Sequence, residues 1–242
     1  MAVTKQLFKL PSLSVFYPCF NEQENLPLVV SQALEILPLV AKKFEIIVVN
    51  DGSTDQTKQV AQKLAVNHKV IRVVSHQQNR GYGASVRTGF KSSKYDWIFY
   101  TDGDGQFNLE ELKVFVKYVQ DYQIIVGYRQ KRAEGFKRIL FARLYKFYID
   151  CLFRVHIKDI DCAFKLIKAE LIKDLDLFSN GAFISAELLY KLKKKRIKVK
   201  QLPVTHYDRV YGKSTGASMK VITIGLWEPL KLYLKMKFNL NL

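Results

Sequence analysis

The chain has 242 residues, of which 48% are hydrophobic and 13% aromatic, a composition that excludes a disordered or low-complexity protein. Its 39 Lys and Arg residues outnumber its 22 Asp and Glu residues, and the formal net charge of +17 favours anionic partners such as nucleic acid, an acidic membrane surface or phosphorylated molecules. Three cysteines without a CxxC pair exclude a disulfide framework and a cysteine zinc site, and they are typical of a reducing compartment.

The first half of the chain alternates between short apolar runs and longer helical patterns. These patterns predict strands at residues 12–17, 45–50, 70–75, 96–101 and 123–127, and helices at 25–41, 55–66, 83–92 and 109–120. Thr54 or Asp55 is expected to cap the second helix. Strands that alternate with helices of this length indicate crossover connections, so we expect an α/β fold with a mostly parallel sheet and helices on both faces.

The pattern changes after Gly127. We expect a charged loop at 130–137, helices at 138–154 and 182–195, strands at 163–167 and 198–204, and a loop at 205–217. No linker or internal repeat divides the chain. The simplest interpretation is a single domain over residues 1–217, followed by an amphipathic, membrane-associating segment at 218–242. Pro229 is expected to break or kink the helix of that segment.

Polar residues follow several of the predicted strands directly. In parallel sheets, ligands bind at the edge where the strands have their carboxyl ends. The segments at this edge are 18–22, 51–55, 102–106 and 127–129. A dinucleotide site is disfavoured because the first strand is not followed by GxGxxG, and the sequence contains no Walker-type phosphate loop.

Asp102 and Asp104 stand one residue apart after the fourth predicted strand, and each is followed by glycine. Two carboxylates at this spacing suit Mg²⁺ or Mn²⁺, and the glycines allow a close approach of backbone and ligand. A cation held here would bridge a diphosphate and neutralise the charge of a leaving group. The pair alone is also compatible with a solvated acidic turn, but Asp51 after the second strand favours the functional interpretation.

Seven short motifs follow one another in a diagnostic order: PCFNEQEN, VVNDGSTDQT, NRGYGASVRTGF, YTDGDGQF, GYR, DIDCAFKL and DRVYGKS. In these motifs the chain resembles family-two glycosyltransferases of the GT-A fold, above all the branch of dolichol-phosphate mannose synthases and polyprenyl-phosphate glycosyltransferases. The resemblance extends from about Ser12 to Ser214. It implies an inverting, metal-dependent transfer of a sugar from GDP-mannose or a UDP-hexose to a polyprenyl or dolichyl phosphate.

The resemblance also implies roles for individual residues. The nucleotide-binding positions are Pro18, Phe20, Asn21, Glu22, Asp51, Ser53, Gly81 and Asp102. The metal positions are Asp102, Asp104 and Gln106, and the catalytic positions are Asp104, Asp159 and Arg209. The phosphate or acceptor positions are Arg129, Arg138, Lys213, Ser214 and Glu187. The departures from the family pattern, at Cys162, Ala163 and Thr215, are all on the acceptor side.

Two alternative functions stay open from the residues themselves. A saccharide hydroxyl could be the acceptor, with Asp104 or Asp159 as general base, or the chain could be a non-catalytic basic protein that binds a membrane or nucleic acid. Nucleic acid is not expected as a partner, because acidic residues cluster at the strand ends. The histidines show no metal-ligand spacing, and surface or packing roles are expected for His68, His76, His156 and His206.

The positive charge and two helical segments predict attachment to a membrane surface. Residues 138–154 and 219–238 both interleave bulky apolar side chains with Lys or Arg, as helices in a membrane interface do. No run of about 18 apolar residues is present, and the first residues lack the apolar core of a signal peptide. We therefore expect a peripheral protein at the cytoplasmic face of a membrane.

Overall fold

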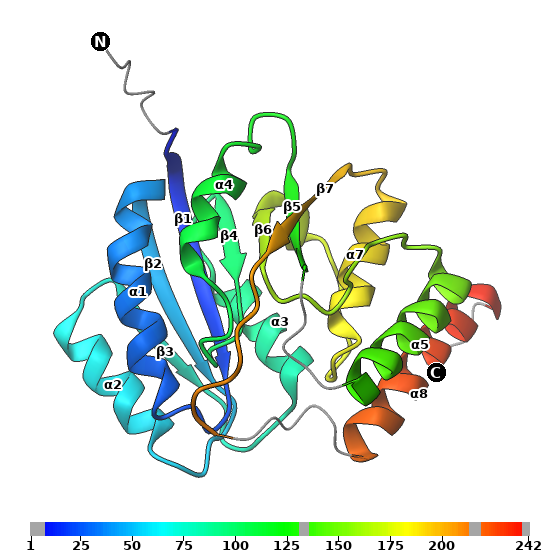
Figure 1. The fold of residues 1–242 in the computed structure, drawn as a ribbon, viewed down its shortest axis with the longest axis horizontal. Coiled ribbons are helices and arrows are strands. Elements are labelled where there is room, and N and C mark those ends of the chain that lie inside the picture. The colour runs from blue at the N-terminus through cyan, green and yellow to red at the C-terminus, as the bar shows by residue number, and fades with distance from the viewer. Residues whose placement is uncertain (1–7, 131–135, 213–218, 239–242) are drawn as a thin grey trace.

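The structure is a computed structural model that describes residues 8–130, 136–212 and 219–238 (Figure 1). Seven strands form one sheet in the order β3-β2-β1-β4-β6-β5-β7. The strands are β1 (Leu10–Cys19), β2 (Ala41–Asn50), β3 (Ile71–Ser75), β4 (Trp97–Tyr100), β5 (Ile124–Arg129), β6 (Lys165–Lys168) and β7 (Val199–Val204). Neighbouring strands are parallel except at β6, which is antiparallel to both β4 and β5.

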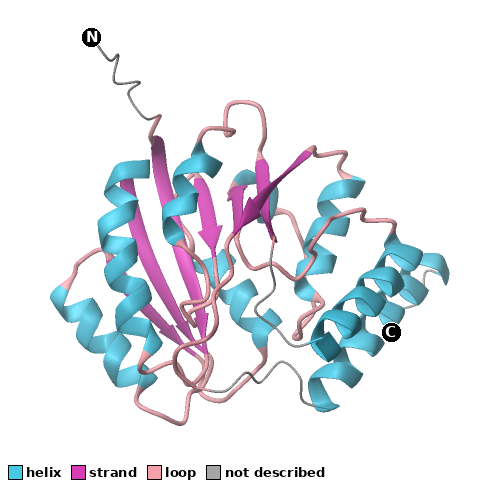
Figure 2. Cartoon of the chain, viewed as in Figure 1, coloured by secondary structure: helices cyan, strands magenta, loops and turns pink. Residues whose placement is uncertain are grey.

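Helices cover both faces of this sheet, as predicted (Figure 2). They are α1 (Asn25–Val40), α2 (Thr57–Asn67), α3 (Tyr82–Ser92), α4 (Leu112–Val116), α5 (Phe136–Phe153), α6 (Glu170–Lys173), α7 (Ile184–Lys194) and α8 (Met219–Phe238), with a 3₁₀ turn, η1 (Leu109–Glu111), before α4. Helix α1 packs on β2 and against α2 and α4, whereas α3 packs on β1 and β2 and contacts α7. Helices α5 and α8 pack on each other beside the sheet (Figure 1).

The middle of the sheet is apolar on both faces, which explains why β1 and β2 read as continuous hydrophobic runs. The Phe16 ring stacks on Tyr100 with ring centroids 5.1 Å apart and meets Phe90 edge-on at 5.2 Å. A Cβ atom at Gly89 would lie 2.3 Å from the Phe16 ring. Helix α3 can therefore lie close to the sheet because residue 89 has no side chain.

Two expectations about helix ends are wrong. The second helix begins after Gln56, and Asp55 instead accepts a hydrogen bond from the Thr57 N–H at 2.9 Å just before it. The helix expected at 109–120 is only η1 followed by α4, which ends at Val116. Beyond that residue the backbone bonds span three residues, as from Tyr118 N to the Phe115 carbonyl (3.0 Å), so the chain tightens and turns toward β5.

Pro229 lies inside a continuous helix, so the expected break in the C-terminal segment is wrong. Proline has no N–H to donate to the carbonyl of the fourth residue before it, Gly225, yet α8 continues on both sides of Pro229. Gly225, Pro229 and Leu232 are buried along one face of α8. Leu226 and Trp227 nevertheless remain 50% and 63% exposed, so the outer face is more apolar than an amphipathic helix requires.

Candidate functional site

The direction of the strands determines which segments meet at one edge of the sheet. All strands except β6 have their carboxyl ends there, and β6 has its amino end there because it is antiparallel. The segments that reach this edge are 20–22, 51–53, 76–81, 101–106, 159–163 and 205–212. The sequence pattern predicted most of these neighbours but not the reversed β6, which brings 159–163 to the edge.

The loops after β1 and β2 are fastened to each other. Asn21 has a φ of 58°, its backbone N–H donates to the Ser53 hydroxyl at 3.0 Å, and its side-chain oxygen accepts from the Thr54 N–H at 2.9 Å. The Glu22 N–H donates to the Thr57 hydroxyl at 2.8 Å. The structure thus brings the predicted residues Asn21 and Ser53 together, but it uses their polar atoms to hold the two loops rather than leaving all of them for a ligand.

Asp51 lies at the centre of the next loop contact. Its side chain is only 4% exposed, and its carboxylate accepts from the backbone N–H groups of Arg80 and Gly81, both at 2.9 Å. Gly81 has a φ of 96°, and a Cβ atom there would lie 2.4 Å from the Asn180 carbonyl oxygen. Glycine at position 81 therefore fits for two reasons, the left-handed backbone and the close approach of another loop.

That other loop, residues 178–181, is held by two buried or half-buried carboxylates. Glu187, which is fully buried, accepts from the N–H groups of Phe178 (3.1 Å) and Ser179 (2.9 Å) and pairs with Lys191 at 2.7 Å. Glu228 of α8 accepts from the N–H groups of the next two residues of the loop, at 2.9 and 3.3 Å. Glu187 was expected to contact an acceptor; here its carboxylate stabilises the loop that packs on Gly81.

The paired aspartates follow β4 directly. A Cβ atom at Gly103 would lie 2.5 Å from the Cys19 sulfur, so the aspartate loop packs tightly on the end of β1. Asp104 accepts a hydrogen bond from the Gln106 N–H at 3.1 Å, and the Gln106 amide donates to the Tyr207 carbonyl at 2.8 Å. The loop that carries the predicted metal positions is thereby joined to the segment after β7.

Asp102 carries the clearest sign of an unsatisfied site. Burial raises its pKa to about 7, the neighbouring Asp104 carboxylate adds to the rise, and a hydrogen bond from Tyr82 opposes it. One carboxylate oxygen, Oδ1, is fully buried without a hydrogen-bond partner. Two adjacent carboxylates with an unused buried oxygen provide hard ligands of the kind that a divalent cation prefers. Among the described residues, no group of three or more His, Cys, Asp or Glu side chains is arranged to hold a metal ion.

Arg209 places a positive charge beside these acids. Its guanidinium lies 2.5 Å from the Glu22 carboxylate and 3.6 Å from that of Asp104, and it also donates to the Tyr211 carbonyl at 2.6 Å. Burial raises the pKa of Glu22, although hydrogen bonds from Asn25 and Arg209 oppose this effect. The predicted catalytic arginine therefore reaches the acidic edge from a segment that is 187 positions from Glu22 in the chain.

On the other side of β4, Arg129 and Asp159 form a nearly buried ion pair. The guanidinium binds both carboxylate oxygens, at 2.7 and 2.9 Å, and the side chains are 9% and 5% exposed. The structure thus brings together Arg129, which was predicted to bind a phosphate or the acceptor, and Asp159, which was predicted to be catalytic. The Arg138 side chain and the residues Lys213 and Ser214 lie outside what the structure describes, so their predicted roles stay predictions.

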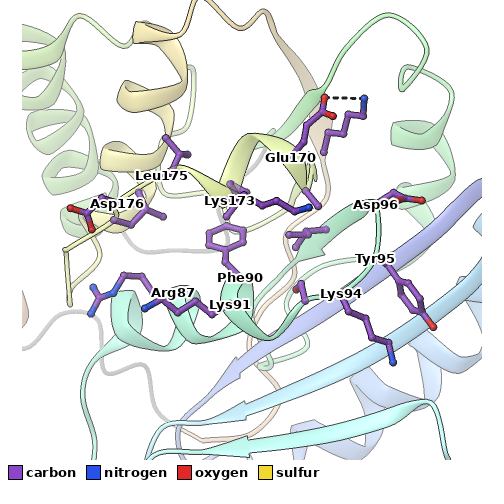
Figure 3. Close-up of a pocket in the computed structure, with 16 residues that line it drawn as sticks. Arg87, Phe90, Lys91, Lys94, Tyr95, Asp96, Glu170, Lys173, Leu175 and Asp176 are labelled. Carbon is purple, nitrogen blue, oxygen red and sulfur yellow. Dashed lines mark ion pairs between the residues drawn. The ribbon is translucent and has the colours of Figure 1, made fainter.

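A cavity of about 570 Å³ lies away from this edge, between α3 and residues 168–177 (Figure 3). Phe90 and Ile98 are among the residues that line it, and so are Lys168 and Glu170, which form an ion pair. None of the predicted site residues lines this cavity. The cavity beside Asp102 measures about 10 Å³, so the strand-edge site is defined by its side chains and not by an enclosed volume.

His76 is the main residue of this region to which sequence reasoning gave no function. It follows β3 directly, and its ring contacts Asp51 with 2.6 Å between Nδ1 and Oδ1. The signal was available, because the third predicted strand ends at the same edge as the first, second and fourth. Cys19 and Cys162 are both buried, and burial raises the pKa of both thiols.

A mostly parallel sheet with a paired-aspartate loop after a central strand defines a GT-A-like α/β protein, and solved structures agree with this fold. Glucosyl-3-phosphoglycerate synthase from Mycobacterium tuberculosis, in complex with Mn²⁺, UDP and glucosyl-3-phosphoglycerate, matches with a TM-score of 0.70 and 18% identity over 92% of this chain and 80% of its own. The same enzyme with Mg²⁺ and UDP gives a TM-score of 0.70 and 16% identity over 92% and 79%.

The chain belongs to glycosyl transferase family 2, whose family pattern matches residues 14–176. It is 28% identical to an undecaprenyl-phosphate 4-deoxy-4-formamido-L-arabinose transferase of Edwardsiella ictaluri, over 88% of this chain and 65% of that protein. It is 26% identical to the dolichyl-phosphate beta-glucosyltransferase of Saccharomyces cerevisiae, over 81% and 67%, and 32% identical to the human enzyme of that name, over 65% and 55%. The chain thus spans between about half and two thirds of the length of these relatives.

Proposed function

We propose that this protein transfers a sugar from a nucleotide-diphosphate donor to a polyprenyl or dolichyl phosphate, with inversion at the anomeric carbon and with Mg²⁺ or Mn²⁺. Membership of family 2 and relatives named as polyprenyl-phosphate sugar transferases support the reaction class. The observation that carries the proposal is the Asp102–Asp104 pair at the strand edge, with its unused buried oxygen.

Asp102 and Asp104 would hold the divalent cation, and Gln106 in the same loop would add its side-chain oxygen as a third ligand. Bound there, the cation would neutralise the negative charge that develops on the departing nucleoside diphosphate. Asp51 would accept a hydrogen bond from an N–H or hydroxyl group of the nucleoside, because its carboxylate is held at the same edge by two backbone N–H groups. Pro18 and Phe20, at the end of β1, would form the adjoining wall of the donor site.

Arg209 would stabilise the diphosphate. Its guanidinium pairs with Glu22 and lies 3.6 Å from Asp104, so a modest rotation would direct it toward a diphosphate bound near these acids. Arginine suits this task because its planar group binds phosphate oxygens in pairs. A segment that carries both Arg209 and Tyr207, which is bonded to Gln106, would enclose the donor and exclude water.

A phosphate acceptor agrees better with the acceptor side than a saccharide hydroxyl does. A hydroxyl group needs a general base, but both oxygens of Asp159 accept hydrogen bonds from Arg129. A lipid phosphate is already an anion at neutral pH and needs positioning by cations, the role proposed for Arg138 and Lys213, while Arg129 binds Asp159. In the part of the chain that the structure describes, no carboxylate is evident as a nucleophile for a double displacement, so a single displacement with inversion is the simpler route.

The site of action would be a membrane surface, and we propose the cytoplasmic face with the protein bound peripherally. Helices α5 and α8 expose Leu144, Phe147, Leu226 and Trp227, which are 50% to 70% accessible. Among the described residues, no helix is both long and apolar enough to cross a bilayer. Flotation with liposomes tests the proposal: more recovery with anionic than with neutral vesicles is expected, and equal recovery or none would contradict the electrostatic part.

One assay tests the proposed reaction directly. The full chain is incubated with Mn²⁺ and a panel of labelled GDP- and UDP-sugars, with polyprenyl phosphate in one arm and polyprenol, which lacks the phosphate, in the other. Labelled lipid with the phosphate alone is the expected result, and its anomeric configuration should be opposite to that of the donor. Transfer to polyprenol or to a saccharide would favour a hydroxyl acceptor. No product, together with no stabilisation by UDP or GDP in a thermal melt, would favour a non-catalytic binding protein.

A further inference from the structure

His76 is a buried part of the wall around Asp51. Its side chain is 5% exposed, and Nδ1 lies 2.6 Å from Asp51 Oδ1. Its other ring nitrogen, Nε2, lies 2.8 Å from the Thr88 hydroxyl on α3, and its backbone N–H donates to the Asn50 carbonyl at 2.9 Å. The ring is therefore held at both nitrogens and at the backbone, which a histidine that merely fills space does not require.

The contacts of Asp51 show what this arrangement achieves. Oδ1 accepts from His76 and from the Arg80 N–H, whereas Oδ2 accepts only from the Gly81 N–H. A carboxylate oxygen can accept two hydrogen bonds, so Oδ2 retains the capacity for one more. The imidazole contact on Oδ1 fixes the rotation of the carboxylate and so determines which oxygen is presented to a ligand.

Thr88 completes the arrangement. When neutral His76 donates from Nδ1 to the carboxylate, Nε2 is an acceptor, and the Thr88 hydroxyl can donate to it. Helix α3 thereby fixes the ring, the ring fixes Asp51, and Asp51 lies in the loop directly after β2. Partners of this kind, one bond removed from the ligand, commonly determine the orientation of a binding group.

We propose that His76 is a positioning residue for the donor nucleoside: it holds Asp51 so that Oδ2 accepts a hydrogen bond from the nucleoside part of the donor, and Thr88 keeps the imidazole in place. The inference rests on the proposed function, because it assumes a nucleotide at Asp51. In this proposal Asp51 and His76 act on the nucleoside of the donor, whereas its diphosphate would be bound at Asp102, Asp104 and Arg209.

The experiment uses calorimetric binding of UDP, GDP and inorganic pyrophosphate, each with Mn²⁺, to the full chain. His76→Phe removes the donor while keeping a planar ring, His76→Asn keeps an amide donor near the position of Nδ1, and Thr88→Val removes only the second contact. His68→Phe, at a histidine for which the structure provides no side-chain hydrogen bond, is the matched control. The thermal unfolding midpoint of each variant is measured in parallel.

His76→Phe should weaken the nucleotide that wild type binds by about tenfold, and His76→Asn should recover part of the loss. Thr88→Val should weaken binding by a few fold. Pyrophosphate affinity should stay within about twofold in every variant, because pyrophosphate has no nucleoside for Asp51 to contact. His68→Phe should bind all three ligands as wild type does.

Two results would overturn the inference while leaving the proposed function intact. In the first, His76→Phe unfolds at a lower temperature but binds nucleotide as wild type does, which makes His76 a brace of the fold only. In the second, His76→Phe loses pyrophosphate and nucleotide affinity equally, which indicates a general loss of the site. If wild type binds neither UDP nor GDP, the proposed function itself is contradicted and the inference falls with it.

Discussion

The donor half of the site, formed by the loops after β1, β2 and β4, differs electrically from the acceptor half, formed by residues after β5 and before β6. In the acceptor half, Arg129 and Asp159 neutralise each other in a bidentate ion pair. In the donor half, the half-buried Asp102 lies beside another acid, burial raises its pKa to about 7, and its Oδ1 has no hydrogen-bond partner. The acceptor half holds a paired acid and base, whereas the donor half keeps a carboxylate oxygen of Asp102 without a hydrogen-bond partner.

This difference teaches where ligand chemistry is to be expected. An ionisable group whose charged form is disfavoured by burial and by a neighbouring like charge lowers the stability of the fold, and such groups concentrate at functional sites. Buried pairs of opposite charge are, by contrast, typical of structural contacts that become costly only when one partner is removed. Four variants test this contrast, in order of decreasing expected effect.

The largest effect is expected from Asp102→Asn. Losing a carboxylate that holds the cation should reduce turnover by about a thousandfold, or about 4 kcal/mol in the activation barrier. The unfolding midpoint should stay level or rise, because the substitution removes a buried charge beside Asp104. Initial rates of lipid-linked product and a thermal melt measure the two effects. Glu110→Gln, at an exposed acid in η1, is the control, and a clear fall in stability of Asp102→Asn would contradict the contrast.

Arg209→Ala should reduce turnover by about a hundredfold, since an arginine that acts mainly in the transition state contributes a few kcal/mol there. The affinity for UDP or GDP should change by no more than about threefold. Steady-state kinetics and calorimetry separate the two quantities. Arg209→Lys, which keeps the charge without the planar group, should lie between the variant and wild type. Small and equal losses in both quantities would exclude the role proposed for Arg209.

Arg129→Met should act on stability, with a loss of about 2 kcal/mol in the free energy of unfolding, because it removes the two charge-assisted hydrogen bonds that the guanidinium donates to the nearly buried Asp159 carboxylate. Adding Asp159→Leu should recover most of that loss. Urea denaturation of wild type, the single variant and the double variant provides the comparison. If the double variant is no more stable than the single one, the two residues do not stabilise the fold as the ion pair described above.

Gly103→Ala should have the smallest effect, a loss of about 1–2 kcal/mol from overpacking. The added methyl group would lie 2.5 Å from the Cys19 sulfur. Cys19→Ala removes that sulfur, so Gly103→Ala should be far less harmful in the Cys19→Ala background. Equal losses in both backgrounds, measured by urea denaturation, would show that the aspartate loop does not rest on Cys19.

Much of the donor half could be predicted from the sequence because its logic is local. Asp51 and the Asp102–Asp104 pair follow strands directly, and parallel strands carry such residues to one edge without any further information. The α/β class, the single sheet and most strands were confirmed for the same reason. The sequence also predicted that the third strand ends at this edge, directly before His76. The contact between the His76 ring and Asp51 could not be predicted, because it depends on how two loops are arranged in three dimensions.

The acceptor half depends on contacts between residues that are distant in sequence. Strand length and composition do not reveal that β6 is reversed, and that reversal brings Asp159 to the edge beside Arg129. The Glu187 carboxylate accepts hydrogen bonds from the backbone of residues 178–179, and this contact depends on the path of that loop, which the sequence pattern does not reveal. The hydrophobic periodicity also could not predict where the helix after η1 ends. The apolar spacing continues past that point, while the backbone hydrogen bonds change to a three-residue span.

The central claim is that the Asp102–Asp104 pair binds a divalent cation together with a nucleoside diphosphate. Calorimetric titration of the full chain with UDP and with GDP, with Mn²⁺ and after its removal by EDTA, tests this most directly. We predict that one of the two nucleotides binds with Mn²⁺ and at least about tenfold more weakly without it, and that Asp102→Asn abolishes the difference. Binding of equal strength with and without the metal, or no binding of either nucleotide, would contradict the account.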